Sequence, residues 1–302
     1  MDAVRRIADT VLYEGYILWP YRKSALKNQR RFGFGTIEPG GFNQTECLLE
    51  AGDGAAVEVT VRFLQLVERQ LWRAGEPVEE LEVDGELHQS WEEAAERELR
   101  FTFDTRSRAR VPVEVAAGVR REELGAACRV ERSWGALRGS VEAGAERLRS
   151  GLFRLRVRLQ NAGPDGDFRS AHTVLVARDG EFVSLTDPAP ELREEAAACE
   201  NAGLWPVLAG EEDDRSTLLA SPIILPDHPE IAPESPGDLF DATEIDQMLV
   251  LNILSLTEEE RRQMRSADPR AREILERTES LSEEELMRLH GTIREFGLAR
   301  RR

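Results

Sequence analysis

The sequence predicts an α+β protein with an N-terminal helix and basic aromatic segment, a central antiparallel β-sandwich-like region, and C-terminal helices. Three patterns support this prediction: helical spacing of apolar residues near the N-terminus, period-two alternation in the centre, and helix caps near the C-terminus. We therefore divide the chain into residues 1–44, 45–190, 191–255 and 256–302. The third part is predicted to be an acidic, proline-rich loop with a helix that packs on the β-rich region.

The first predicted element is a short amphipathic helix over residues 2–14. Its apolar residues Val4, Ile7, Ala8 and Val11 recur at helical spacing and fall on one face. The helix leads into the basic aromatic segment, and Gly40-Gly41 then predicts a turn.

The centre of the chain alternates apolar and polar residues, which is the pattern of half-buried strands. The clearest example is Phe153–Leu159, where four apolar residues alternate with three arginines. Arg178-Asp179-Gly180 lies between two apolar runs and predicts a hairpin. The acidic stretches 76–98 and 191–202 are predicted to be helical or loop-like. Further strands are predicted around Val57–Phe63, Leu99–Phe103 and Val111–Val115.

The chain between residues 211 and 246 is acidic and rich in proline. Prolines exclude a helix over residues 221–238, because each removes a backbone donor and disfavours the helical conformation in the residue before it. We expect an ordered extended loop there, since its isoleucines and leucine are too apolar for a solvated linker. Helix signals then return over Ala242–Leu254, in the capping boxes Thr257-x-x-Glu260 and Ser282-x-x-Glu285, and at the N1 proline Pro269.

Composition limits the class of protein. The 302 residues carry a formal net charge of −17, which argues against nonspecific binding to nucleic acid and to anionic membranes. Cys47, Cys128 and Cys199 are far apart in sequence and form no CxxC pair, so neither a disulfide framework nor a zinc site is indicated. Without a signal-peptide pattern or a membrane-span pattern, we expect a soluble cytoplasmic protein.

One segment concentrates chemistry that the rest of the chain lacks. All three tyrosines and both lysines lie between residues 13 and 27, and residues 13–31 carry five basic side chains against one acid. Aromatic faces can stack on a ligand, and guanidinium groups pair with oxyanions. The predicted partner-binding or anion-binding surface consists of Tyr13, Glu14, Tyr16, Tyr21, Arg22, Lys23, Lys27, Asn28 and Arg31.

Three interpretations of this segment stay open. It is a structural clasp that meets the acidic residues 211–246, a surface for a protein partner, or a small-ligand or catalytic site. A clasp leaves no cavity, whereas a site leaves a pocket with unpaired charges. Gly33-Phe34-Gly35 is a weak phosphate signal, since no Gly-Lys-Ser/Thr follows it.

A second candidate site is acidic. Carboxylates suit Mg²⁺, Mn²⁺ or Ca²⁺, and one histidine with carboxylates suits Fe²⁺ or Ni²⁺ as well. Asp238 or Asp241 would alternatively cap the helix that begins near Ala242, with Glu244 favoured by its dipole. The candidate metal ligands are Asp227, His228, Glu230, Asp238, Asp241 and Glu244.

No motif marks a catalytic nucleophile. The chain has no G-x-S-x-G elbow, and its four histidines are scattered. His172, at the start of a predicted strand, is expected to be a core or edge histidine. The sequence indicates no particular cofactor.

Three stretches resemble a family of uncharacterised bacterial proteins, mainly actinobacterial, associated with NiFe-hydrogenase gene clusters. They are Tyr13–Phe32, Ser221–Leu225 with Ile231–Asp246, and Leu256–Glu260 leading to Asp268–Ala271. The resemblance implies a cytoplasmic accessory or assembly role with a protein partner, such as a hydrogenase subunit or maturation factor. We therefore expect a non-enzymatic accessory protein. The alternative is an enzyme or metal-handling protein whose site lies between residues 13–31 and the acidic residues 227–246.

Overall fold

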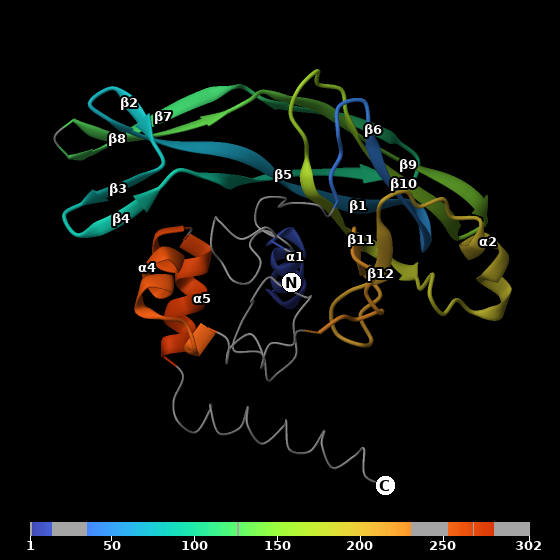
Figure 1. Cartoon of the computed structure of the whole chain (residues 1–302). Coiled ribbons are helices and arrows are strands. Elements are labelled where there is room, and N and C mark those ends of the chain that lie inside the picture. The colour runs from blue at the N-terminus through green and yellow to red at the C-terminus, as the bar shows by residue number, and fades with distance from the viewer. Residues whose placement is uncertain (1, 14–34, 126, 231–252, 268, 281–302) are drawn as a thin grey trace, which may run out of the picture.

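The chain folds mostly into antiparallel β-sheet, with a helix at its N-terminus and helices towards its C-terminus (Figure 1). The computed structural model describes residues 2–13, 35–125, 127–230, 253–267 and 269–280. In these ranges, every helix is too short or too polar to cross a membrane.

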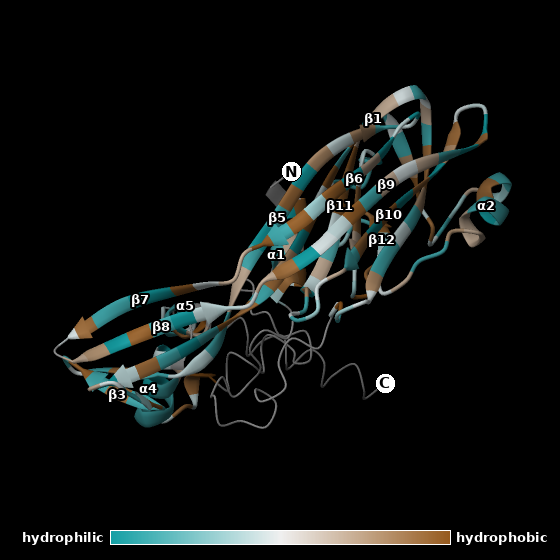
Figure 2. Ribbon diagram, turned by 90° about the horizontal axis from the view of Figure 1, so that it is seen from above, coloured by the Kyte–Doolittle hydropathy of each residue, from teal (hydrophilic) through white to brown (hydrophobic). Residues whose placement is uncertain are grey.

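One long strand, β1 (Phe42–Arg73), organises the sheet. β10 (Leu152–Asn161) and then β5 (Trp91–Asp104) pair with successive parts of one edge of β1, while β11 (Arg169–Val183) pairs with the other edge. The far end of β1 pairs with β2 (Glu76–Val78) and β8 (Cys128–Trp134). β1 therefore connects the two ends of the elongated molecule in Figure 2.

The remaining strands extend this framework. The main path runs β12-β13-β11-β1-β10-β9-β6, and β7 pairs with β8, while β3 and β4 form a separate ribbon. These strands span Trp205–Leu208 (β12), Thr217–Ser221 (β13), Leu137–Arg149 (β9), Arg108–Val115 (β6), Gly118–Gly125 (β7), Glu80–Val83 (β3) and Glu86–Gln89 (β4).

The main core follows the predicted alternation. Val57, Val59, Val61 and Phe63 are buried together, in one cluster with side chains of β5, β6, β9, β10, β11 and β13. Leu155, Val157 and Leu159 of β10 join the same cluster, so the apolar half of Phe153–Leu159 is core as predicted. The sandwich-like arrangement of these strands stays a prediction.

Helices cover part of the sheet. α1 (Asp2–Tyr13) buries Val4, Ile7, Ala8 and Val11 against β12 and β13, which confirms the predicted face. α4 (Glu258–Ala267) and α5 (Pro269–Glu279) lie near β3 and β4 at one end, and the short α2 (Arg193–Ala197) lies at the other (Figures 1 and 2).

The predicted helix starts in the C-terminal region are confirmed where the structure describes them. The Thr257 amide donates to the Glu260 carboxylate at 3.0 Å, and the Glu260 amide donates to the Thr257 hydroxyl at 3.3 Å. This reciprocal pair is a capping box. Pro269 is the first residue of α5. Ser282 and most of Ala242–Leu254 lie outside the described residues.

Two strand-region predictions are wrong. β11 continues through Arg178-Asp179-Gly180, and both of its halves pair with β1 instead of with each other. Asp179 has a φ of 60°, and the register of β1 shifts between Ala51 and Ala56, so the turn residues form an irregularity in the ladder.

The acidic stretch 76–98 is not helical, because β2, β3, β4 and part of β5 occupy it. Asp84 and Gly85, with φ of 53° and 81°, form the two-residue turn between β3 and β4. An Asp-Gly pair is a strong hairpin signal. The prediction for this stretch relied on its acidic composition and therefore missed the hairpin. The prediction for residues 191–202 is confirmed by α2 and the non-strand residues beside it.

Candidate functional site

The predicted docking segment begins at Tyr13, a buried residue that is hydrogen-bonded to the sheet. Tyr13 ends α1, and its side chain is 6% exposed. Its hydroxyl donates a short hydrogen bond to the carboxylate of Glu96 on β5. The other proposed docking residues lie outside the described residues: Glu14, Tyr16, Tyr21, Arg22, Lys23, Lys27, Asn28 and Arg31.

The chain after this segment is also attached to the sheet. The carbonyl of Gly35 accepts a hydrogen bond from the amide of Ala171 at 3.1 Å, and Ile37 pairs with Phe168. Gly35 has a φ of 54°, and a β-carbon there would lie 2.8 Å from Pro222. Glycine therefore permits both the backbone conformation and the close approach.

An ionic cluster around the buried Arg62 holds α1 on the sheet. The Arg62 side chain of β1 is 6% exposed, and its Nη2 lies 2.6 Å from Oδ1 of Asp9 on α1. The same guanidinium lies 3.4 Å from Glu96 and 3.6 Å from Glu98, both on β5. Since Glu96 also accepts from Tyr13, this cluster positions the first residue of the docking segment.

His172 lies beside Arg62 in the β1–β11 register and is fully buried. Its Nδ1 is 3.0 Å from the carbonyl oxygen of Ser170, and within the described ranges Nε2 has no hydrogen-bond partner. Burial, with a contribution from Arg62, lowers the pKa of His172 to about 4. The imidazole is neutral at pH 7, so the prediction of a core histidine is confirmed.

The geometry around His172 does not assemble a catalytic triad in the described part of the chain. The Ser170 hydroxyl is buried and has no hydrogen-bond partner among the described residues, and its backbone φ is 50°. His172 is bonded through the Ser170 carbonyl oxygen instead of its hydroxyl. Because both side chains are fully buried, a substrate has no access to them in this conformation.

Two candidate metal ligands that the structure describes, Asp227 and His228, are hydrogen-bonded to the edge strand of the sheet. Oδ2 of Asp227 accepts from the hydroxyls of Ser184 and Thr186 at 2.5 Å, and Oδ1 accepts from the amide of Leu208 at 2.8 Å. The amide of His228 donates to the carbonyl of Leu208 at 2.8 Å. Asp227 and His228 thus satisfy the outward-facing backbone amide and carbonyl of Leu208, and so cover part of the exposed edge at β12.

The pKa of Asp227 reflects these contacts. Partial burial favours the protonated carboxyl, but the three hydrogen bonds outweigh it, so its pKa is lowered. Among the residues that the structure places, no three His, Cys, Asp or Glu side chains are grouped to hold a metal. Glu230 is exposed, while Asp238, Asp241 and Glu244 lie outside the described residues, so the metal site stays a prediction.

Replacing Asp227 with alanine should lower the free energy of unfolding by about 2 kcal/mol, because the buried Leu208 amide loses its acceptor. Urea unfolding of metal-free protein measures this change. The matched control is Asp213→Ala, which removes an exposed carboxylate close in sequence. Equal stability of the two variants would contradict the edge-capping role.

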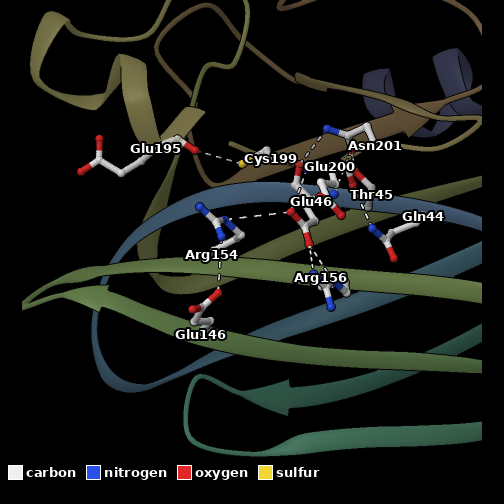
Figure 3. A network of polar contacts seen from close by, with 10 residues as sticks. All are labelled: Gln44, Thr45, Glu46, Glu146, Arg154, Arg156, Glu195, Cys199, Glu200 and Asn201. Atoms are coloured by element: carbon white, nitrogen blue, oxygen red, sulfur yellow. Dashed lines mark hydrogen bonds and ion pairs between the residues drawn. The ribbon is translucent and has the colours of Figure 1, made fainter. Parts of the chain in front are cut away.

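A second polar network surrounds the buried carboxylate of Glu46, which is 1% exposed (Figure 3). Its Oε1 accepts from Nε of Arg156 at 2.6 Å, and its Oε2 accepts from the amide of Glu200 at 2.8 Å. The amide of Glu46 donates to Asn201 at 2.9 Å. The arginine alternation of Phe153–Leu159 was visible in the sequence, but its pairing with Glu46 depends on strand register and was missed.

Two of the three free cysteines lie near this network. Burial, followed by Cys199 and Glu46, raises the pKa of the Cys47 thiol well above its usual value. Burial also raises the pKa of Cys199 to about 11, although Arg154 acts in the opposite direction. Both groups are protonated thiols at neutral pH, which is unlike an activated cysteine nucleophile.

Comparison with models of protein families gave no match, and comparison with curated proteins gave none either. The class that the fold defines is a mostly antiparallel β-sheet protein with an N-terminal helix and C-terminal helices.

Proposed function

We propose that this chain is a non-enzymatic accessory or assembly protein of the cytoplasm that binds a protein partner. The proposed docking residues are the eight predicted residues from Glu14 to Arg31, and the ninth, Tyr13, is buried and anchors the start of the segment. The partner that the family resemblance implies is a hydrogenase subunit or maturation factor.

The observation that supports this proposal is the attachment of the chain on both sides of residues 14–34. Tyr13 is bonded to Glu96, and Gly35 is bonded to Ala171. The intervening sequence has five basic side chains and one acid in a strongly acidic protein. A partner that binds these side chains is therefore connected to the folded sheet at two points, which suits an assembly role.

A second candidate is an enzyme or metal-handling protein with a site between the basic and acidic segments. Its specific support is that residues next to the basic segment lie against residues near the acidic segment. Leu12 and Tyr13 share a buried cluster with Ile253 and Leu256, and Gly35 lies against Pro222. Residues 231–252 contain five acids and no base, so their charge is opposite to that of residues 14–34. The structural clasp has the same support.

The double variant Lys23→Ala/Lys27→Ala should keep the melting temperature of the wild type and reduce partner capture at least about tenfold. The physical reason is the loss of two charged contacts, each worth about 1 kcal/mol or more at an interface. The measurement is affinity capture by the tagged protein from its own cytosol, with quantitative mass spectrometry and metal analysis of one eluate.

The charge-matched control is Arg120→Ala/Arg138→Ala, two exposed arginines of β7 and β9. It should capture the same partner as the wild type. A lower melting temperature with capture in proportion to folded protein would support the clasp instead. Isolation of the protein alone with stoichiometric metal or nucleotide would support the second candidate, and preserved stability with preserved capture would contradict both docking and clasp.

We also propose the sandwich-like arrangement for the central strands. Its support is that side chains of β6, β9 and β10 share one buried cluster with side chains of β5, β11 and β13.

A further inference from the structure

The long hairpin made of β6, β7, β8 and β9 is interrupted at the same level in both of its arms. Val115 pairs with Leu137 before the interruption and Gly118 pairs with Trp134 after it, so the register is unchanged. We call the residues between these pairs the joint, and all four are small, exposed and outside the strands: Ala116, Ala117, Gly135 and Ala136. The joint lies between the main sheet and the far end of the molecule, which consists of β2, β3, β4, β7, β8, α4 and α5 (Figure 2).

The strands exchange neighbours at the joint. On the side of the main sheet β9 pairs with β10, whereas on the side of the far end β8 pairs with β1. One edge of β1 changes partner at this level as well, because its ladder with β11 ends at Leu64 and its ladder with β8 begins at Glu68. Among the described strands, the pair β1–β5 passes this level without an interruption. A ribbon of two strands twists more strongly and is less stable than a wider sheet.

Side chains hold two backbone carbonyls of the joint. The amide nitrogen of Gln65 donates to the carbonyl oxygen of Gly135 at 2.6 Å, and Arg97 donates to the Gln65 amide oxygen at 3.0 and 2.8 Å. The indole N–H of Trp134 donates to the carbonyl oxygen of Ala116 at 3.1 Å. Gln65 is 2% exposed and lies on β1, so it connects the unbroken ribbon to the interrupted hairpin. These bonds can break while every strand pair is kept.

An open groove of about 500 Å³ lies at the joint. Leu66 of β1 and Glu92 of β5 line it from the ribbon, and Ala117, Gly118 and Gly135 line it from the hairpin. The groove leaves the hairpin room to bend towards the ribbon. Because the joint residues have small or no side chains, such a bend moves few atoms.

A buried apolar cluster is a second restraint on the far end. Leu12 and Tyr13 of α1 are buried together with Ile274 and Leu275 of α5. α4 contacts β4, and Nη2 of Arg272 on α5 lies 3.5 Å from the Glu86 carboxylate on β4, so both helices are attached to the far end. The cluster therefore joins the far end to α1, which is packed on the main sheet.

We propose that the joint is a hinge about which the far end tilts relative to the main sheet, and that Gln65 holds its resting position. Hinges are commonly a few residues at the ends of elements, often small ones, and the β1–β5 ribbon provides the pivot. A tilt shifts α5 against Tyr13, the residue at which the docking segment begins. This consequence for docking rests on the proposed function, whereas the hinge itself does not.

The test is single-molecule energy transfer in the full chain between dyes at Glu82 of β3 and Glu114 of β6, two exposed positions on either side of the joint. The dyes are attached through unnatural amino acids, so that the native cysteines stay in place. The wild type should show one dominant transfer efficiency and a minor second one. Gln65→Leu should raise the ratio of the second state to the first at least about tenfold, because three hydrogen bonds that favour the resting position are lost.

The matched control is Gln70→Leu, because Gln70 lies on the same strand and also takes part in three side-chain hydrogen bonds, all within the far end. It should keep the wild-type distribution. Trp134→Phe, which removes the bond to Ala116 and keeps an aromatic ring, should raise the second state even if Gln65→Leu does not fold. Melting temperatures show which variants are folded.

One unchanged efficiency in the folded Gln65→Leu and Trp134→Phe proteins would overturn the hinge. An equal shift in Gln70→Leu would overturn it too, since the effect would then be a general loss of stability. Neither result bears on partner capture by residues 14–31, which is measured separately.

Discussion

Replacing Arg62 with methionine should lower the free energy of unfolding by about 3 kcal/mol. Removing one partner of a buried ion pair typically costs about 3 to 5 kcal/mol, because the remaining charge loses its counterion. Asp9, Glu96 and Glu98 are each at least 35% exposed, so water can partly solvate them, and we expect the lower end of this range. Denaturant unfolding of the purified variant measures the change.

The same variant should release α1 before the rest of the sheet. Arg62 contacts Asp9 of α1, and this contact adds to the burial of Val4, Ile7 and Val11. Amide hydrogen exchange should therefore rise in residues 4–13 more than in β10. The matched control is Arg100→Met, whose guanidinium is 52% exposed and shares Glu98 as a partner. It should change stability by less than about 1 kcal/mol. Unchanged exchange in α1 of the Arg62 variant would contradict the anchoring role.

The elements with regular apolar spacing could be predicted from the sequence. Val4, Ile7, Ala8 and Val11 identified the buried face of α1, and Val57–Phe63 identified a core strand. These predictions succeeded because burial of one face imposes a local period of 3.6 or 2 residues. The helix starts at Thr257 and Pro269 succeeded for a related reason, since capping chemistry is local in sequence.

The polar sites could not be predicted in the same way. Arg62 occupies a polar position of the β1 alternation, which suggests exposure to solvent, but α1 covers that face and buries it. The partnership of Glu46 with Arg156 depends on the register of β1 against β10, between residues 110 positions apart. Local pattern gives no information on such pairings. The hairpin at Arg178-Asp179-Gly180 failed for this reason too, because β1 provides a partner for both halves of β11.

The candidate docking site could be predicted from residue composition, and not from a recognisable catalytic or binding motif. The concentration of tyrosine, lysine and arginine in residues 13–31 was evident from the sequence. Only the structure indicates that Tyr13 is bonded to Glu96 and that Glu96 also contacts Arg62. The closeness of carboxylates and a histidine in the sequence predicts a metal site that includes Asp227. In the structure its oxygens accept hydrogen bonds from Ser184, Thr186 and Leu208, which lie at distant positions.

Acidification should destabilise the protein by about 3 kcal/mol through His172 alone. The pKa of this residue is about 4 in the folded protein and about 6.5 in the unfolded chain. The unfolded chain therefore takes up the proton first as the pH falls. The contribution to stability is complete above about pH 6.5, is lost progressively towards pH 4, and changes little below that. A difference of 2.5 pKa units at about 1.4 kcal/mol per unit gives the stated magnitude.

The comparison that isolates this effect is His172→Gln. Between pH 7 and pH 4, its free energy of unfolding should fall by about 3 kcal/mol less than that of the wild type, because glutamine does not titrate. Asp227 also loses a stabilising charge as the pH falls, but it does so in both proteins and cancels in the difference. His88→Gln is the control, since its half-buried imidazole has a pKa lowered by burial and by Arg69 and should give a smaller difference. Identical pH profiles for the wild type and His172→Gln would mean that the imidazole reaches water in the folded state. In that case the assignment of His172 as a buried, neutral core residue would be wrong.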